Sequence, residues 1–80
     1  MKLYFIRFTD EANEGYYYKC RQQVNGKQTI ITCLDIEDAF VLSSERSAVN
    51  IAKDLVVQYN AECVVEAYKC RLEEIIETFE

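Results

Sequence analysis

The sequence predicts a small α+β domain in which an antiparallel sheet packs against one amphipathic helix. Half of the 80 residues are hydrophobic, which is enough for a folded core. An Asn-Gly dipeptide at Asn25 and Gly26 divides two strand-like runs, and apolar residues recur every three to four positions over Glu45–Tyr59. A chain of this length holds one core, so we expect a single domain over residues 1–80 with three or four strands, in the order β-β-β-α-β.

The first element is predicted to be an inner strand. Lys2–Thr9 is rich in aromatic and β-branched residues, and apolar side chains occupy both of its alternating faces. The polar run Asp10–Gly15 that follows reads as a connecting loop. Ala12 stands at the third position of this run, where a calcium loop carries an oxygen ligand, so calcium is not expected.

The next two strands form a predicted hairpin. Only Asn25 and Gly26 separate Tyr16–Val24 from Lys27–Leu34, and this dipeptide tolerates the two positive φ angles of a type I′ turn. The two-residue loop sets the register, because it pairs the residues on either side of it. The expected pairs are Val24 with Lys27, Cys20 with Ile31, and Tyr18 with Cys33.

Regular alternation along this hairpin predicts two different faces. The face expected to meet the core carries Tyr16, Tyr18, Cys20, Val24, Ile31 and Cys33. The opposite face carries Tyr17, Lys19, Arg21, Gln23, Gln28, Ile30, Thr32 and Leu34. This second face mixes bases and amides with apolar groups, which is typical of a solvated sheet face or of a protein contact.

The helix is predicted over Glu45–Tyr59. Ser43 and Ser44 precede it, and either hydroxyl can accept a hydrogen bond from a free N–H of the first turn. Asn60 is the expected end, because asparagine tolerates the left-handed conformation that follows a helix. The apolar stripe consists of Ala48, Val49, Ile51, Ala52, Leu55, Val56 and Tyr59.

The C-terminal segment leaves two alternatives open. A strand over Glu62–Arg71, followed by a short helical turn through Ile75 and Phe79, is favoured by the β-branched run at its start and by the tetrapeptide Tyr-Lys-Cys-Arg, which also occurs in the hairpin. The alternative is a second full helix, because apolar residues from Ala61 onward also follow a heptad-like stripe.

The composition argues against an enzyme and against a cofactor. The chain has no histidine, the side chain that most often carries proton transfer near neutral pH, and its two glycines are too few for a phosphate-binding loop. Its four cysteines (Cys20, Cys33, Cys63 and Cys70) contain no C-x-x-C pair. We therefore expect reduced thiols and no bound metal, in preference to disulfides or structural zinc.

The charge is negative and uneven. Fourteen acids against nine bases give a net charge of −5, and the second half of the chain carries most of the excess. Glu73, Glu74 and Glu77 lie close together near the C-terminus, where they would repel a phosphate backbone and attract a basic protein surface. No stretch is long enough for a membrane span or a signal-peptide core, so a cytoplasmic location is expected.

The order of features resembles that of small phage and prophage proteins. The resemblance rests on an initial strand like Leu3–Phe8, a Gly-Tyr-Tyr strand like Gly15–Tyr18, and a segment like Asp38–Ser44 that leads into the helix. Such acidic phage proteins include inhibitors of host enzymes and defence systems, among them anti-CRISPR proteins. The resemblance implies a location in the host cytoplasm and transfers no functional residue.

The function predicted from these observations is a non-enzymatic protein-binding module, a phage-type inhibitor whose acidic surface engages a basic surface of a host protein. Its predicted partner-binding residues are Tyr17, Lys19, Arg21, Glu73, Glu74 and Glu77. One alternative is a small regulatory or accessory subunit that forms a homodimer through its sheet. The other is a single-stranded nucleic-acid binder that uses the tyrosines and bases of the hairpin, against which the net charge argues.

Overall fold

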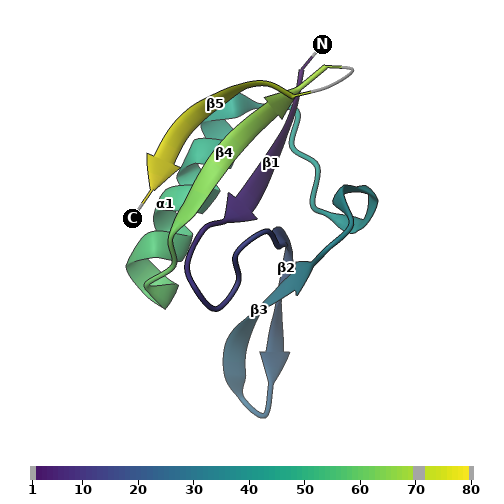
Figure 1. Cartoon of the computed structure of the whole chain (residues 1–80). Helices are drawn as coiled ribbons and strands as arrows, with labels where there is room; N and C mark the ends of the chain where they lie inside the picture. The colour runs from purple at the N-terminus through teal and green to yellow at the C-terminus, as the bar shows by residue number, and fades with distance from the viewer. Residues whose placement is uncertain (1, 70–71, 80) are drawn as a thin grey trace.

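The computed structural model describes residues 2–69 and 72–79, except for the side chains of residues 72–75 and 77. Five strands form one antiparallel sheet in the order β3-β2-β1-β4-β5. The elements are β1 (Leu3–Phe8), β2 (Tyr17–Val24), β3 (Lys27–Cys33), the 3-10 turn η1 (Ile36–Asp38), α1 (Glu45–Tyr59), β4 (Cys63–Tyr68) and β5 (Leu72–Phe79). Figure 1 shows α1 behind β4 and β5, while the β2–β3 hairpin extends away from them. The predicted α+β class is confirmed.

The core lies between α1 and the two central strands. β1 is an inner strand, as predicted, and pairs with β4 along its whole length, from Leu3 opposite Tyr68 to Phe8 opposite Cys63. Alternate residues of both strands point toward the helix. The buried core contains Tyr4, Ile6 and Phe8 from β1, Cys63, Val65 and Ala67 from β4, and Ala48, Ala52 and Leu55 from α1.

Both predicted ends of the helix are confirmed. The Oγ of Ser44 accepts a hydrogen bond from the backbone N–H of Ser47 at 3.3 Å, so Ser44 is the N-cap. Asn60 follows the last turn with φ of 55°, and its N–H donates back to the carbonyls of Leu55 and Val56. The left-handed residue ends the helix and directs the chain into β4.

The hairpin turn is confirmed, and the register is confirmed only near the turn. Asn25 and Gly26 have φ angles of 51° and 80°, as a type I′ turn requires. Val24 pairs with Lys27 and Cys20 with Ile31, but Tyr18 pairs with Thr32 rather than with Cys33.

A β-bulge causes this difference. The register shifts between Tyr18 and Cys20, so Lys19 is an extra residue without an opposite partner on β3. The extra residue reverses the alternation of β2 on its two sides. Of the six residues predicted to meet the core, only Tyr18 is buried, and Ile30, predicted on the other face, packs against the core instead.

The C-terminal segment is two strands. The predicted strand over Glu62–Arg71 is confirmed at β4, and its last two residues lie outside the described residues. The helical turn and the full second helix are both wrong, because residues 72–79 form β5. The sheet therefore has five strands rather than three or four. Two register irregularities leave Glu73 and Ile76 without opposite partners, which stretches the apolar spacing of β5 from two residues to three or four and so imitates a helix.

The short segment at Leu42, rather than β2, lies beside the first half of β1. β1 and β2 pair only where Arg7 lies opposite Tyr17, near the connecting loop. Further along, the N–H of Tyr4 donates to the carbonyl of Leu42 at 2.7 Å, and the N–H of Leu42 donates to the carbonyl of Tyr4 at 3.0 Å. The hairpin therefore separates from β1 soon after Tyr17, while β2 and β3 stay paired with each other.

Candidate functional site

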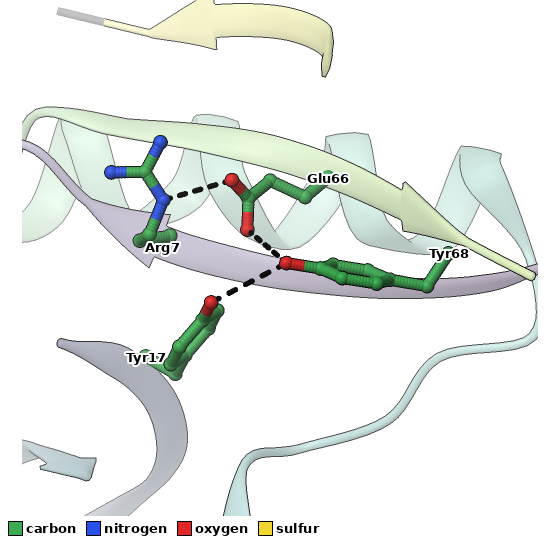
Figure 2. A network of polar contacts seen from close by, with 4 residues as sticks. All are labelled: Arg7, Tyr17, Glu66 and Tyr68. Atoms are coloured by element: carbon green, nitrogen blue, oxygen red, sulfur yellow. Dashed lines mark hydrogen bonds and ion pairs between the residues drawn. The ribbon is translucent and has the colours of Figure 1, made fainter. Parts of the chain in front are cut away.

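Four polar side chains form a network on the sheet face that α1 does not cover (Figure 2). The Nε of Arg7 donates to Oε2 of Glu66 at 2.8 Å, and the hydroxyl of Tyr68 donates to Oε1 of the same carboxylate at 3.2 Å. The hydroxyls of Tyr17 and Tyr68 are 3.4 Å apart. Because Tyr68 already donates to Glu66, Tyr17 is the donor in this pair.

The strand register brings these residues together. Core residues flank Arg7 in β1 and Glu66 in β4, so alternation places both charged side chains on the opposite face. Phe5 lies directly opposite Glu66 and packs edge-on against Tyr17 and Tyr68, with ring centroids 6.3 and 5.3 Å away. The exposed fractions of Phe5 and Glu66 are only 6% and 3%, so the cluster shields its own centre from water.

The electrostatics of the network follow from this burial. The hydrogen bond from Arg7 to Glu66 raises the pKa of the guanidinium, so the arginine stays charged. Burial and the nearby negative charge of Glu66 raise the pKa of the Tyr68 phenol well above its ordinary value. Tyr68 therefore stays protonated and donates to Glu66, and the carboxylate links β1 to β4 through satisfied polar contacts.

The structure separates the predicted hairpin residues. Tyr17 belongs to the network on the open face, and Lys19 is the exposed bulge residue. Arg21 lies on the helix side, where its Nη1 is 2.6 Å from Oδ2 of Asp54. The expectation that Tyr17 and Arg21 share one face is wrong, because the bulge between them reverses the alternation.

Arg21 connects the hairpin to the helix. Burial by itself lowers the pKa of Arg21, but hydrogen bonds with Tyr18 and Asp54 raise it overall, so the guanidinium stays charged. Nearer the turn, the hydroxyl of Tyr59 donates to Oε1 of Gln28 at 3.3 Å. These two contacts hold the exposed hairpin beside the C-terminal half of α1.

The predicted acidic residues lie at the edge of the sheet opposite to the hairpin. Glu73, Glu74 and Glu77 all belong to β5, the last strand in the order, and their side chains lie outside the described part of the structure. Two strands, β1 and β4, separate β5 from β2. The six predicted partner-binding residues therefore do not form one site.

The described cysteines are free thiols in different environments. Cys63 is fully buried, and burial raises the pKa of its thiol to about 11. Cys20 and Cys33 are half-buried in the hairpin, and burial also raises the pKa of Cys33. Cys70 lies outside the described residues. Within residues 2–69 and 72–79, no group of three or more histidine, cysteine or acidic residues is arranged to hold a metal ion.

Arg7 and Glu66, the charged pair at the centre of the network, are not among the site residues predicted from the sequence. A signal was present, because each is a lone charge inside an otherwise apolar strand, Leu3–Phe8 for Arg7 and Cys63–Tyr68 for Glu66. Buried charges are usually paired, so two such strands predict an ion pair when they are neighbours. Only the pairing of β1 with β4 shows that they are.

Comparison with protein-family models, curated proteins and solved structures finds no match for this chain. In the part of the chain that the structure describes, the single α-helix is neither long nor apolar enough to cross a membrane. The function is therefore inferred from the surfaces that the fold presents.

Proposed function

We propose that this protein is a non-enzymatic protein-binding module, an inhibitor of the phage type that competes for a basic, nucleic-acid-binding surface on a host protein. The observation that carries the proposal is the position of β5. It is the last strand of the sheet, and it carries Glu73, Glu74 and Glu77 within eight residues.

An acidic edge strand has two properties that suit this function. Its outer side can accept an extended segment of a partner by strand addition, because no other strand of the described residues pairs with that side. Its glutamates attract a basic partner and speed the encounter. The same charges repel β5 of a second copy, so the edge is protected from self-pairing.

The hairpin gives little support to the nucleic-acid alternative. Stacking along a single strand requires aromatic and basic side chains on one continuous face. Tyr17 and Arg21 point to opposite faces, and Arg21 is held by Asp54. This arrangement and the net charge of −5 both favour a protein partner over a nucleic acid.

The test is an affinity capture from cell lysate with three forms of the immobilised protein. The first is the wild type, and the second carries Glu73→Lys, Glu74→Lys and Glu77→Lys. The third carries Glu11→Lys, Glu14→Lys and Glu37→Lys, which changes the net charge equally at exposed positions outside β5. We expect the wild type and the third form to enrich the same basic proteins, and the β5 variant to lose them. An added oligonucleotide should release them, because it competes for the same surface.

Two results would contradict the proposal. Equal loss in both triple variants would show that total charge acts rather than β5. Tight binding of the wild type to single-stranded DNA or RNA, lost on Lys19→Glu and Arg21→Glu, would favour the nucleic-acid alternative. Circular dichroism of each variant shows whether it is folded.

A further inference from the structure

We propose that the opposite edge of the sheet, strand β3, pairs with β3 of a second copy of this chain. The two strands would run antiparallel about a two-fold axis at Ile30 and join both sheets into one. β3 is the last strand on its side, and β2 is its only neighbour in the sheet order of the described residues. This self-association is independent of the function proposed for β5, which stays free in the dimer.

The hairpin turn determines which backbone groups of β3 point outward. The carbonyl of the residue before a type I′ turn accepts the N–H of the residue after it, so Val24 and Lys27 are a hydrogen-bonded pair. Along an antiparallel strand such pairs alternate with pairs that are not hydrogen-bonded to each other. Lys27, Thr29 and Ile31 therefore bond to β2. The N–H and C=O groups of Gln28, Ile30 and Thr32 face away from β2, toward the open edge.

Only an axis at Ile30 pairs all three outward residues with one another. An axis at Thr29 would place Thr32 opposite Gly26, and an axis at Ile31 would place Gln28 opposite Leu34, both outside β3. With the axis at Ile30, Ile30 pairs with its own copy, and Gln28 pairs with Thr32 on either side, so every outward group finds a partner. An axis at Gln28 would place Ile30 opposite Gly26 in the turn. An axis at Thr32 would place Gln28 opposite Ile36 in η1. Neither of those positions continues the strand.

The side chains of β3 are compatible with this register. Its only charged residue is Lys27, which would lie opposite Cys33, so no like charges meet directly. Asp35 of the second copy, whose backbone is extended, would lie diagonally from Lys27 with the opposite charge. β3 contains no proline, glycine or acidic residue, and its centre is Thr-Ile-Ile-Thr. β3 therefore lacks most of the sequence features that protect edge strands from pairing.

The exposure of the hairpin supplies an independent argument. Residues 22–29 are all exposed, and β2 pairs with β1 only at Tyr17. The outer part of the hairpin is thus a two-stranded ribbon, a structure that is marginally stable in water on its own. Pairing through β3 would make it a four-stranded sheet.

Three variants at two facing positions test the edge. Gln28→Pro removes an outward N–H and places the proline ring on the proposed interface, while an edge strand tolerates proline where the N–H faces solvent. Gln28→Ala removes the contact with Tyr59 but keeps the N–H. Gln23→Pro changes the residue directly opposite Gln28. The N–H of Gln23 points to the other side of the hairpin, away from the open edge of β3. The readout is the molar mass by sedimentation over a range of protein concentrations.

We expect the wild type, Gln28→Ala and Gln23→Pro to reach twice the mass of the chain at high concentration, and Gln28→Pro to remain monomeric. A wild type that stays monomeric at millimolar concentration would overturn the proposal. Loss of the dimer in Gln23→Pro but not in Gln28→Pro would overturn it as well, because the other side of the hairpin would then be the interface.

Amide hydrogen exchange tests the same register without a substitution. The N–H groups of Gln28, Ile30 and Thr32 should gain protection as the protein concentration rises, while those of Lys27, Thr29 and Ile31, which already bond to β2, should gain less. Protection of the outward three that does not depend on concentration would contradict pairing with a second copy.

Discussion

The packed part of the sheet and the hairpin differ in how their residues are held. β1 and β4 pair along their full lengths, and α1 covers one of their faces while the Arg7–Glu66 network fills the other. The β2–β3 hairpin meets β1 at one residue pair and is tied to α1 through Arg21 and Gln28. Figure 1 shows the hairpin extending beyond the strands that α1 covers.

This difference indicates where stability and binding reside. Buried apolar area stabilises the packed part, so its residues should unfold together with the whole domain. The exposed hairpin buries little and should open locally at a lower free energy. A surface that keeps unpaired backbone groups is also the one on which a partner strand can add.

Leu55→Ala should destabilise the domain by about 2–5 kcal/mol, because it removes a fully buried side chain and leaves a cavity. Val57, two residues along the same helix, is 83% exposed, so Val57→Ala should change the free energy of unfolding by less than about 0.5 kcal/mol. Urea unfolding followed by circular dichroism measures both. Similar effects at the two positions would show that α1 does not pack on the sheet as described.

The stability of the packed part should fall in alkaline solution because of Cys63. The thiol has a pKa of about 11 in the folded state and close to 9 when unfolded, so the unfolded chain loses its proton first as the pH rises. The stabilisation is complete below pH 9 and falls by about 2–3 kcal/mol by pH 11. Cys63→Ala should reduce this decrease of the free energy of unfolding with pH, whereas Cys33→Ala in the hairpin should leave most of the decrease. A slope unaffected by Cys63→Ala would assign the effect to other groups.

Two ion pairs allow a matched comparison of the regions. Arg7→Met leaves the Glu66 carboxylate buried without its partner and should cost about 1–3 kcal/mol, less than a fully buried pair because Arg7 is partly exposed. Replacing both residues with methionine should restore most of that loss. The Arg21–Asp54 pair is nearer the surface, so its coupling energy in the same cycle should be below about 1 kcal/mol. Thermal unfolding of the two double-mutant cycles gives the coupling energies.

Gly26→Val should affect the hairpin more than the packed part of the sheet. A left-handed conformation costs a branched residue about 1–2 kcal/mol. Apart from the adjoining residues of the chain, no heavy atom lies within 4 Å of the added Cβ, so the cost is conformational rather than a steric clash. The strain should raise the hydrogen-exchange rates of amides in β2 and β3 more than those of amides in β4. Equal changes in the hairpin and in β4 would show that the hairpin does not open separately.

Elements whose causes are local can be predicted from the sequence alone. The type I′ turn depends on Asn25 and Gly26 alone, and the helix on an apolar period between Ser44 and Asn60. Each of these signals acts within a few residues along the chain, through backbone φ angles, caps and helical spacing. Their positions were therefore predicted correctly.

Tertiary contacts determine the bulge at Lys19, the strand at residues 72–79 and the ion pair of Arg7 with Glu66. The bulge depends on the point at which β2 separates from β1. β5 depends on β4, because it pairs with the side of β4 that β1 does not occupy. Arg7 and Glu66 are 59 residues apart, so neither predicts the position of the other. Contacts of this kind depend on which strands become neighbours, and the hydrophobic pattern of each strand is compatible with more than one neighbour.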